Sequence, residues 1–360
     1  MMTLLIITVV FFILYLFYPL WLKSLPNSIY SEEEKGEPEG VSIVYLSNNS
    51  ESTIGQKIGF LLNEMDDLPQ SELLVIDDGS KDSSMEILNG IKDCRLRIIS
   101  KKEHNGIAHS MNLGVEMSKF EYIIFCDQRQ KLSEGIIKKL IIPLQYSEIG
   151  AVSSCISNYD KTNRYSVLRA HENFIKKEEG KTGNLMGVYG PLYALKKKYY
   201  KPIPEYIILD DLYLSLNILS SKKIVFLNEC QIYDEGIDIL YTYKRTKRYV
   251  TGFVQILKDR ALLAGLSRKQ IIMILWHKYL RIVLPLLILL CYIVFAAHAL
   301  NNSYLMLFFS AMTITIILIL VSSRGKNRSQ IGSICRIITF YSFALIEILI
   351  LSLLKKNVNE

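Results

Sequence analysis

The chain has 360 residues, of which 50% are hydrophobic and 21% are charged, and its formal net charge is +7. Because so many apolar and charged residues cannot share one uniform domain, the composition excludes both a wholly soluble protein and a wholly lipid-buried one. The six cysteines show no close pairing such as C-x-x-C, which argues against structural zinc and a disulfide framework and fits a reducing compartment.

The chain starts with an uncharged apolar segment, residues 1–22, which is long enough to cross the ~30 Å hydrocarbon layer as a helix. It lacks a basic n-region, and no small-x-small cleavage site follows before Lys23, so we expect a retained transmembrane anchor rather than a cleaved signal peptide. Residues 23–40 are rich in Glu, Pro and Gly and show no apolar periodicity. We therefore expect an acidic linker between this anchor and the next domain.

Residues 41–240 alternate short apolar runs with helical stretches, which predicts an α/β domain with a mostly parallel sheet and helices on both faces. The expected strands are residues 41–46, 72–76, 97–100 and 122–126, and the expected helices are residues 56–65, 83–91 and 108–117. Two of the strands end in carboxylates, in Asp77-Asp78-Gly79-Ser80 and in Asp127-Gln128-Arg129. Carboxylates at the carboxyl ends of strands are how such a sheet builds a nucleotide site.

A third acidic motif, Leu209-Asp210-Asp211, precedes an amphipathic helical stretch, and a strongly basic segment follows at residues 241–281. That segment has Asp259 as its single acid and interleaves its cations with apolar residues. Nucleic-acid binding is the competing explanation for this charge. Because the segment directly precedes membrane-like sequence, we expect amphipathic helices on the lipid surface and no nucleic-acid partner.

Residues 282–355 are expected to form three transmembrane helices, which with the anchor makes four. The uncharged stretch 282–323 is long enough for two spans broken near 298–303, and residues 337–354 form the last. Glu347 interrupts that last span, so it should face protein or water, either along a polysaccharide exit path or paired with a neighbouring helix.

The orientation in the membrane follows from the basic hinge at residues 324–336, which carries cations and no acid. The positive-inside rule puts this hinge, and with it residues 23–281, in the cytoplasm. The sequence therefore predicts a multi-pass protein of the bacterial plasma (inner) membrane with a cytoplasmic α/β domain.

In this order, the D-D-G-S, D-Q-R and L-D-D motifs and the basic R-T-K-R-Y of residues 245–249 resemble the membrane-bound family-2 inverting glycosyltransferases. These are relatives of the cellulose, chitin-oligosaccharide and hyaluronan synthases, and the resemblance covers residues 41–355. It implies a GT-A type nucleotide-sugar domain that transfers a hexose from a UDP-sugar to a glycan acceptor with inversion, in polysaccharide synthesis. Two other functions stay open: a lipid-linked sugar transferase, and a non-catalytic membrane relative that binds nucleotide sugars.

On the donor side, the resemblance implies a nucleotide site at Asp77, Asp78 and Gly79, with the Asp78 carboxylate accepting hydrogen bonds from uridine. It also implies a divalent cation, Mg²⁺ or Mn²⁺, on Asp127, the first acid of the family's D-x-D motif. Arg129 replaces the second acid. Either Asp127 holds the metal with help from phosphates and water, or Arg129 supplies the positive charge itself, or Arg129 points away into an ion pair.

On the acceptor side, the resemblance implies that Gly190, in the segment 187–193, lines the acceptor sugar; the same segment would also suit an ordinary turn between strands. Asp211 would be the base that takes the proton of the acceptor hydroxyl, with Asp210 as its neighbour. Both carboxylates would also suit a helix N-terminus, where the helix dipole favours negative charge.

Arg245, Arg248 and Tyr249 fall where processive synthases carry Q-x-x-R-W, and the resemblance implies that Arg248 neutralises the departing diphosphate. A patch that only binds lipid headgroups is the alternative. The sequence departs from the family pattern at Tyr249, which replaces a tryptophan, at Asn48, which replaces an aromatic residue, and at Ile107, which replaces a lysine. The expected partners are a UDP-sugar, a glycan or lipid-linked acceptor, and membrane lipids.

Overall fold

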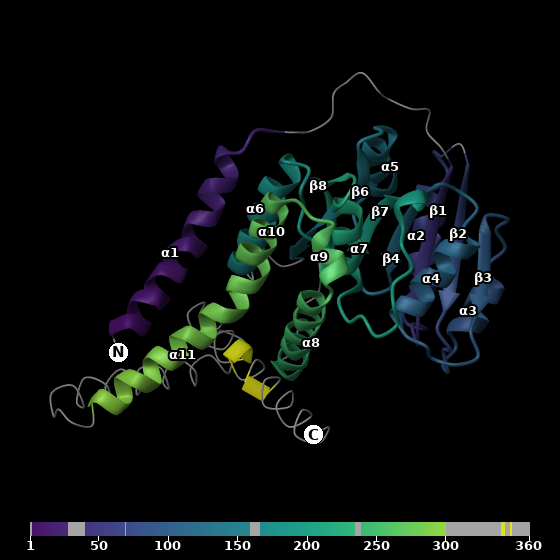
Figure 1. Cartoon of the computed structure of the whole chain (residues 1–360). Coiled ribbons are helices and arrows are strands. Elements are labelled where there is room, and N and C mark those ends of the chain that lie inside the picture. The colour runs from purple at the N-terminus through teal and green to yellow at the C-terminus, as the bar shows by residue number, and fades with distance from the viewer. Residues whose placement is uncertain are drawn as a thin grey trace.

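The computed structural model describes residues 2–27, 40–68, 70–158, 166–234, 239–299, 340–342 and 346–347. Its centre is an eight-stranded sheet in the order β3-β2-β1-β4-β7-β6-β8-β5, with helices packed around it (Figure 1). The strands are β1 (Val41–Ser47), β2 (Ser71–Asp77), β3 (Leu96–Ser100), β4 (Tyr122–Asp127), β5 (Lys131–Leu132), β6 (Ile149–Asn158), β7 (Leu192–Lys196) and β8 (Lys223–Asp234). The α-helices of this domain are α2 (Ile54–Glu64), α3 (Ser84–Gly90), α4 (Ile107–Met117), α5 (Ile136–Ile141), α6 (Ser166–Lys181) and α7 (Asp210–Leu219).

The first four strands are parallel and bring the two predicted acidic motifs to one edge of the sheet. Strand β1 lies between β2 and β4, with Ser47 opposite Asp77 and Leu46 opposite Asp127. Because parallel strands share the edge at which they end, both acidic motifs flank the carboxyl end of β1.

The sheet as a whole is mixed: besides the first four strands, β6 and β8 also pair in parallel, so four of the seven strand pairs in the described residues are parallel and the predicted mostly parallel sheet holds with antiparallel exceptions. Strand β7 is antiparallel to both β4 and β6, and β5 is antiparallel to β8. The reason lies in the turn before β7, where the backbone N–H of Asp127 donates to the carbonyl oxygen of Pro191 (2.8 Å). Since β7 starts at the edge where β4 ends, it has to run in the opposite direction.

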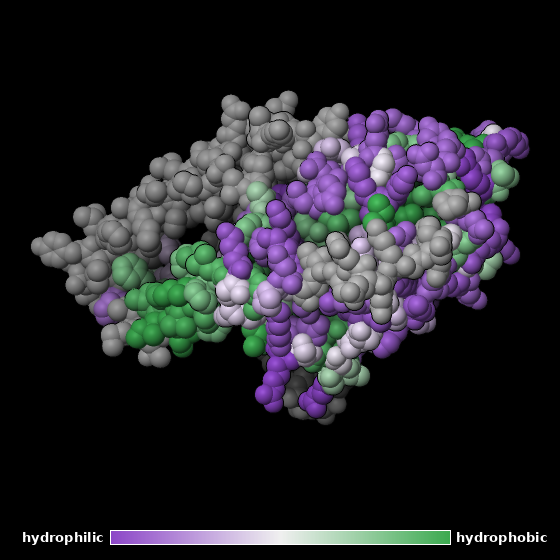
Figure 2. Space-filling model, turned by 90° about the horizontal axis from the view of Figure 1, so that it is seen from above, coloured by the Kyte–Doolittle hydropathy of each residue, from purple (hydrophilic) through white to green (hydrophobic). Residues whose placement is uncertain are grey.

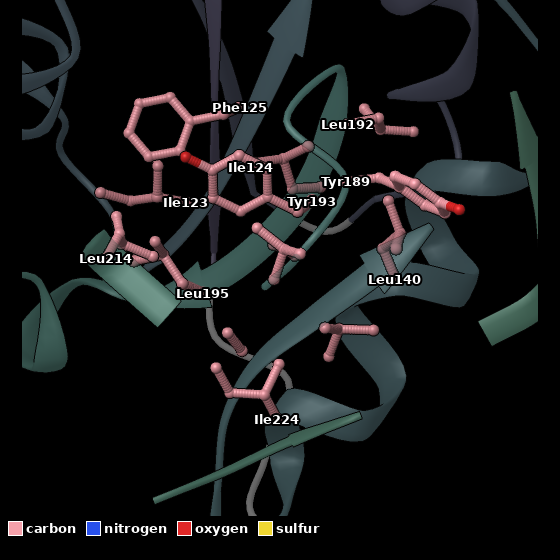
Figure 3. Close-up of a cluster of buried hydrophobic side chains, with 14 of the residues drawn as sticks. Ile123, Ile124, Phe125, Leu140, Tyr189, Leu192, Tyr193, Leu195, Leu214 and Ile224 are labelled. Atoms are coloured by element: carbon pink, nitrogen blue, oxygen red, sulfur yellow. The ribbon is translucent and has the colours of Figure 1, made fainter. Parts of the chain in front are cut away.

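The core beneath this edge is apolar on both faces of the sheet. Figure 3 shows Ile123, Ile124 and Phe125 of β4 packed with side chains from β7, α5, α7 and β8. The rings of Phe125 and Tyr193 lie 5.2 Å apart between centroids, and all these strand residues are at most 2% exposed. Burying each such side chain stabilises the fold by about 1.5–3 kcal/mol. A rigid β4 therefore carries Asp127 at its end.

Two helices within the described residues are long and apolar enough to cross a membrane, spanning Leu5–Ser24 and Arg268–His298. The first belongs to α1 (Met2–Ser24), and the second comprises α10 (Arg268–Ile274), the π-helical turn η3 (Leu275–Tyr279) and α11 (Leu280–Ala299). Helices α1 and α11 pack on each other, and Thr8 Oγ1 lies 3.1 Å from Cys291 Sγ. Figure 2 shows apolar side chains gathered where these helices lie and hydrophilic ones over the α/β domain.

The first predicted span coincides with α1, whereas the second apolar helix begins at Arg268 rather than at Ile282. The polar residues in the first half of this helix, His277, Lys278 and Arg281, all pair with a carboxylate of α6, so their polar groups are satisfied although the helix is apolar beyond them. Residues 28–39 of the predicted linker, the hinge at 324–336 and nearly all of the third and fourth predicted spans lie outside the described residues.

Candidate active site

The Asp77 carboxylate closes the turn after β2. Asp77 is fully buried, and its oxygens accept hydrogen bonds from the Ser80 hydroxyl, from Ser80 N–H (3.1 Å) and from Ser100 Oγ (3.3 Å). Gly79 has φ of +70°, and a side-chain carbon there would lie 3.0 Å from the backbone of Glu103. Glycine is the residue that tolerates both constraints, so the turn can pass close to the loop after β3.

The Asp78 carboxylate organises that loop. It accepts hydrogen bonds from the backbone N–H groups of Asn105 (2.9 Å) and Gly106 (3.0 Å). It also pairs with Lys101 Nζ (2.5 Å) and His104 Nδ1 (2.8 Å). Burial acts to raise the pKa of Asp78, but the hydrogen bond and charge of Lys101 and the Asn105 amide outweigh burial and the pKa is lowered. Asp78 is therefore a charged carboxylate surrounded by four donors.

Asn48 connects the two acidic motifs across the end of β1. Its side-chain amide donates to the backbone oxygen of Asp78 (2.6 Å). Its backbone exchanges two hydrogen bonds with the Gln128 side chain, at 3.0 and 3.2 Å. Asn48, which replaces the family's aromatic residue, thus connects the turn at Asp78 with the segment that follows Asp127.

Asp127 and Arg129 form an ion pair at the edge of the sheet. Arg129 donates to Asp127 Oδ2 through Nη2 (3.0 Å) and Nε (3.3 Å), and Gln128 N–H donates to Oδ1 (2.7 Å). The side chains are 28% exposed for Asp127 and 58% exposed for Arg129. Arg129 therefore pairs with Asp127 itself and does not point away from it, and the exposed pair is accessible to a ligand.

A divalent cation fits this edge only with help from the substrate. Within the described ranges, no three His, Cys, Asp or Glu side chains come together as a metal-ligand group. Mg²⁺ is commonly held by one or two carboxylates together with substrate phosphates and water. Asp127 supplies one such carboxylate, so a bound diphosphate and water would have to provide the remaining oxygens.

Asp210 and Asp211 occupy the first turn of α7, where the helix dipole favours negative charge. Asp211 Oδ1 accepts from the backbone N–H of Leu212 (2.8 Å). A side-chain carbon on Gly190 would lie 3.4 Å from Asp211 Oδ2, so the chain passes directly beside this carboxylate. We call residues 185–191 the acceptor loop, after the role that the family resemblance implies for Gly190. The next residue of the loop, Pro191, accepts a hydrogen bond from the backbone N–H of Asp127, so one turn contacts the backbone at the end of β4 and lies beside the Asp211 carboxylate.

The two carboxylates of α7 differ in their surroundings. Burial and the charge of Asp211 raise the pKa of Asp210 to about 7, and Arg248 acts to lower it. Arg248 Nη2 lies 3.9 Å from Asp210 Oδ1 and donates to the carbonyl oxygen of Ile208 (3.2 Å). Asp211 thus faces the acceptor loop, while Asp210 faces a cation and has a pKa near neutral pH.

Helix α8 (Ile239–Lys258) is held against the segment that leads into α7. Gln255 accepts from Ile208 N–H (3.1 Å) and donates to the oxygen of Tyr206 (2.8 Å). A side-chain carbon on Gly252 would overlap the side chain of Leu209, so only glycine allows this close approach. The docking places Arg248 beside the acid pair.

The other two residues of the predicted Q-x-x-R-W position are engaged with each other. Arg245 Nη2 donates to the Tyr249 hydroxyl (3.1 Å), and its guanidinium lies 5.5 Å from the centre of the Tyr249 ring. Tyr249 also stacks on Phe253. The structure therefore brings Arg248 to the acid pair and gives Arg245 and Tyr249 contacts along α8.

Glu347 contacts α8 as well. It forms an ion pair with Lys247 and accepts a hydrogen bond from the Tyr243 hydroxyl (3.0 Å). Of the two roles predicted for Glu347, the structure has the pairing with a neighbouring helix.

Several contributors to the site were missed by sequence reasoning. Lys101 and Gln128 carry a local signal, because both follow strands that end at the site. Lys176 and Glu179 of α6 do not, since both lie in a helix with no recognisable motif, and they reach the acceptor loop through tertiary packing alone.

The mixed α/β sheet with acids at the ends of two parallel strands, β2 and β4, is a GT-A-like fold. Residues 42–203 match the family described as Glycosyl transferase family 2, so the chain carries a domain of that family. Domains of this family are nucleotide-sugar-dependent glycosyltransferases.

Similar proteins support the family and the fold. The chain is 22% identical over 351 residues to the poly-beta-1,6-N-acetyl-D-glucosamine synthase of Staphylococcus epidermidis, covering 88% of this chain and 84% of that protein. It is 25% identical over 189 residues to the Escherichia coli UDP-Glc:alpha-D-GlcNAc-diphosphoundecaprenol beta-1,3-glucosyltransferase WfgD, covering 52% of this chain and 73% of the relative. Glycosyltransferase GlyG of Streptococcus pneumoniae is 31% identical, but only 26% of this chain and 31% of that protein align.

Among solved structures, the mannosyltransferase PcManGT from Pyrobaculum calidifontis, in complex with GDP-Man and Mn²⁺, has the same fold with a TM-score of 0.76. It is 16% identical, and the match covers 94% of this chain and 96% of that one. Because the match extends over nearly the whole length of both chains, the two proteins share their overall architecture.

Proposed function

We propose that this protein is a membrane-anchored inverting glycosyltransferase that moves a hexose from a UDP-sugar to a glycan acceptor during polysaccharide synthesis. The observation that carries the proposal is the turn at Gly190 and Pro191: Gly190 lies beside the Asp211 carboxylate, and the Pro191 carbonyl accepts a hydrogen bond from the backbone N–H of Asp127. A donor diphosphate at Asp127 and an acceptor hydroxyl at Asp211 would then meet at this turn.

In the proposed reaction, Asp211 takes the proton from the acceptor hydroxyl as its oxygen attacks the anomeric carbon. Inversion at that carbon follows from a single displacement, which would give a β-linkage from an α-linked donor. Asp210 adds negative charge beside the base once it has lost its own proton. The helix N-terminus and the Leu212 amide keep the Asp211 carboxylate in place.

On the donor side, the loop that Asp78 organises receives the nucleotide, and Arg248 offers a cation to the departing diphosphate. Asp127 would hold a divalent cation, which when bound neutralises charge on the diphosphate. The Mn²⁺ seen with GDP-Man in the mannosyltransferase of the same fold is consistent with this role.

The proposed location is the bacterial plasma membrane, with the α/β domain in the cytoplasm and several spanning helices. Two apolar helices of sufficient length and the basic surface of α8 support it. The polysaccharide synthase relative aligns across 88% of this chain, so the similarity extends well beyond residues 42–203.

A lipid-linked acceptor is the second candidate, and the similarity to a diphosphoundecaprenol glucosyltransferase favours it. The test is to offer a panel of UDP-sugars to the detergent-purified protein and to measure UDP release and product size. An aqueous polymer supports the first candidate, and a product that extracts into organic solvent supports the second. No UDP release with any sugar or acceptor would favour a non-catalytic nucleotide-sugar binder.

A further inference from the structure

A buried polar cluster joins the apolar helices to the α/β domain. Glu179 of α6 is 0% exposed and accepts hydrogen bonds from the Tyr18 hydroxyl of α1 (2.6 Å) and from His277 Nδ1 of η3 (2.7 Å). Its other oxygen accepts from the backbone N–H of Met186, in the acceptor loop (3.0 Å). One carboxylate therefore connects two candidate membrane helices with the loop beside the acid pair.

A second carboxylate of α6 secures the same junction. Glu172 lies 3.2 Å from His277 Nε2, 3.4 Å from Lys278 Nζ and 2.7 Å from Arg281 Nη1. The π-helical turn at residues 275–279 carries His277 and Lys278 to these carboxylates. Such turns are rare and occur often where a helix serves a function. The junction is thus a specific polar interface, although it lies among apolar helices.

Glu179 remains charged in this setting. Burial acts to raise its pKa, but the charge and hydrogen bond of His277, the charge of Lys278 and the hydrogen bond of Tyr18 outweigh burial and the pKa is lowered. Removing one partner of a buried charge is strongly unfavourable, so the charged state of Glu179 depends on α1 and η3 remaining docked on α6.

The acceptor loop is fixed from two sides. On the side of α7, Val188 N–H donates to Ser215 Oγ (3.1 Å), and Ser215 Oγ donates to the backbone oxygen of Asp211 (2.6 Å). On the side of α6, Glu179 bonds Met186, and Lys176 Nζ donates to the carbonyl oxygen of Gly187. The distance between the loop and Asp211 therefore depends on α6 as much as on α7.

We propose that Glu179 is a positioning residue for the transfer reaction. It holds the acceptor loop at its working distance from Asp211 through the Met186 N–H, and it is itself held in place by Tyr18 of α1 and His277 of η3. This proposal rests on the proposed function. It makes the apolar helices part of the catalytic unit in addition to being anchors.

The test compares Glu179→Leu with Glu179→Gln in the full-length, detergent-purified protein. The Met186 N–H can only donate, so the glutamine oxygen would turn towards it, and the glutamine NH₂ group can donate to the Tyr18 hydroxyl oxygen. We expect Glu179→Gln to keep most of the activity. In Glu179→Leu we expect kcat to fall by on the order of 10²-fold with UDP affinity unchanged, because misplacing a reacting group by about 1 Å costs that much.

Glu178→Gln is the matched control, because Glu178 lies on the same helix and pairs with Lys181 away from the acceptor loop. Wild-type kcat in Glu179→Leu, an equal loss in Glu178→Gln, or a parallel loss of UDP affinity would each overturn the positioning role. If the Leu variant does not fold, Tyr18→Phe removes a single donor and should lower kcat about two- to tenfold. An unchanged kcat there would likewise overturn it. Failure of the wild type to release UDP would instead refute the proposed function.

Discussion

Gly190 lies beside Asp211: a side-chain carbon added at position 190 would be 3.4 Å from Asp211 Oδ2, in van der Waals contact with it. The approach joins a loop that precedes β7 to the first turn of a helix that follows β7. Because glycine has no side chain, position 190 leaves open the space beside the carboxylate that an acceptor hydroxyl needs in order to approach a base.

The first prediction concerns this base. Asp211→Asn should lower the rate of transfer by ~10²–10⁴-fold, because an amide cannot take the acceptor's proton. UDP affinity, measured by calorimetry, should stay close to that of the wild type, since Asp211 faces the acceptor loop. Wild-type turnover in the Asn variant would remove Asp211 from its assigned role.

The second prediction is a pH profile. Burial and the charge of Asp211 raise the pKa of Asp210 to about 7. When Asp210 loses its proton, its negative charge favours proton transfer from the acceptor hydroxyl to the neighbouring carboxylate, so kcat/KM should rise with pH and level off above that value. Because the folded pKa of Asp210 is raised above the unfolded value of about 4, the contribution of Asp210 to the free energy of unfolding is fully present below the unfolded pKa. This contribution is lost as the pH rises through the folded pKa of about 7.

The Arg248→Ala variant tests this pH dependence of kcat/KM. Arg248→Ala should move the inflection of kcat/KM to higher pH, because Arg248 acts to lower the pKa of Asp210. Arg245→Ala is the control, since Arg245 lies on the same helix but contacts Tyr249, and its inflection should not move. Asp210→Asn should abolish the inflection. Identical profiles for the two arginine variants would contradict the assignment.

The third prediction concerns Asp78. Asp78→Ala should weaken UDP binding by about tenfold or more, since hydrogen bonds to a charged group are worth about 1.5–3 kcal/mol each. The structure adds a reason that the sequence did not suggest, because the carboxylate organises residues 101–106.

Lys101→Met distinguishes the two reasons for the Asp78 effect. If the ordered loop matters, this variant should also weaken UDP binding, because Lys101 pairs with Asp78. The exposed Lys92 provides a control substitution, Lys92→Met. A loss confined to Asp78→Ala would indicate direct contact with uridine. Unchanged affinity in both variants would leave the turn with a structural role alone.

The fourth prediction concerns the metal. We expect EDTA to stop the reaction, and Arg129→Asp to lower the Mn²⁺ concentration that gives half-maximal activity. The reason is that Arg129 competes with a cation for Asp127 Oδ2, and a second carboxylate would attract the cation. Full activity in EDTA, together with its collapse in Arg129→Ala, would show that the guanidinium takes the place of the metal.

The fifth prediction concerns stability. Gly252→Ala should lower the stability of the protein by about 1–3 kcal/mol, because the added carbon overlaps Leu209 in a packed contact. Gly59→Ala is the matched control, since nothing lies within 4 Å of a side-chain carbon there and alanine favours a helix by about 0.5–1 kcal/mol. In thermal unfolding in detergent, Gly252→Ala should unfold at a lower temperature than the wild type and Gly59→Ala at a higher one.

The parallel half of the sheet and the acidic edge could be predicted from the sequence because their signals are local. Strand periodicity locates β2 and β4, and parallel strands must deliver Asp77 and Asp127 to one edge. The antiparallel entry of β7 could not be predicted in this way, because it depends on a tertiary bond between Asp127 and Pro191.

The residues around the site were harder to predict for the same reason. Tyr18, Glu179 and His277 meet in space but lie in three widely separated segments, and no spacing rule connects them. The pairing of Arg245 with Tyr249 also depends on rotamers along α8 that a motif does not encode.

The Asn48 bridge has a consequence for the thermodynamics of ligand binding. Since Asn48 bonds Asp78 on one side and Gln128 on the other, a ligand that orders one motif reduces the conformational entropy that the other must lose. Nucleotide and metal should therefore bind with positive cooperativity. Linkage makes this reciprocal, so the factor by which Mn²⁺ tightens UDP binding has to equal the factor by which UDP tightens Mn²⁺ binding.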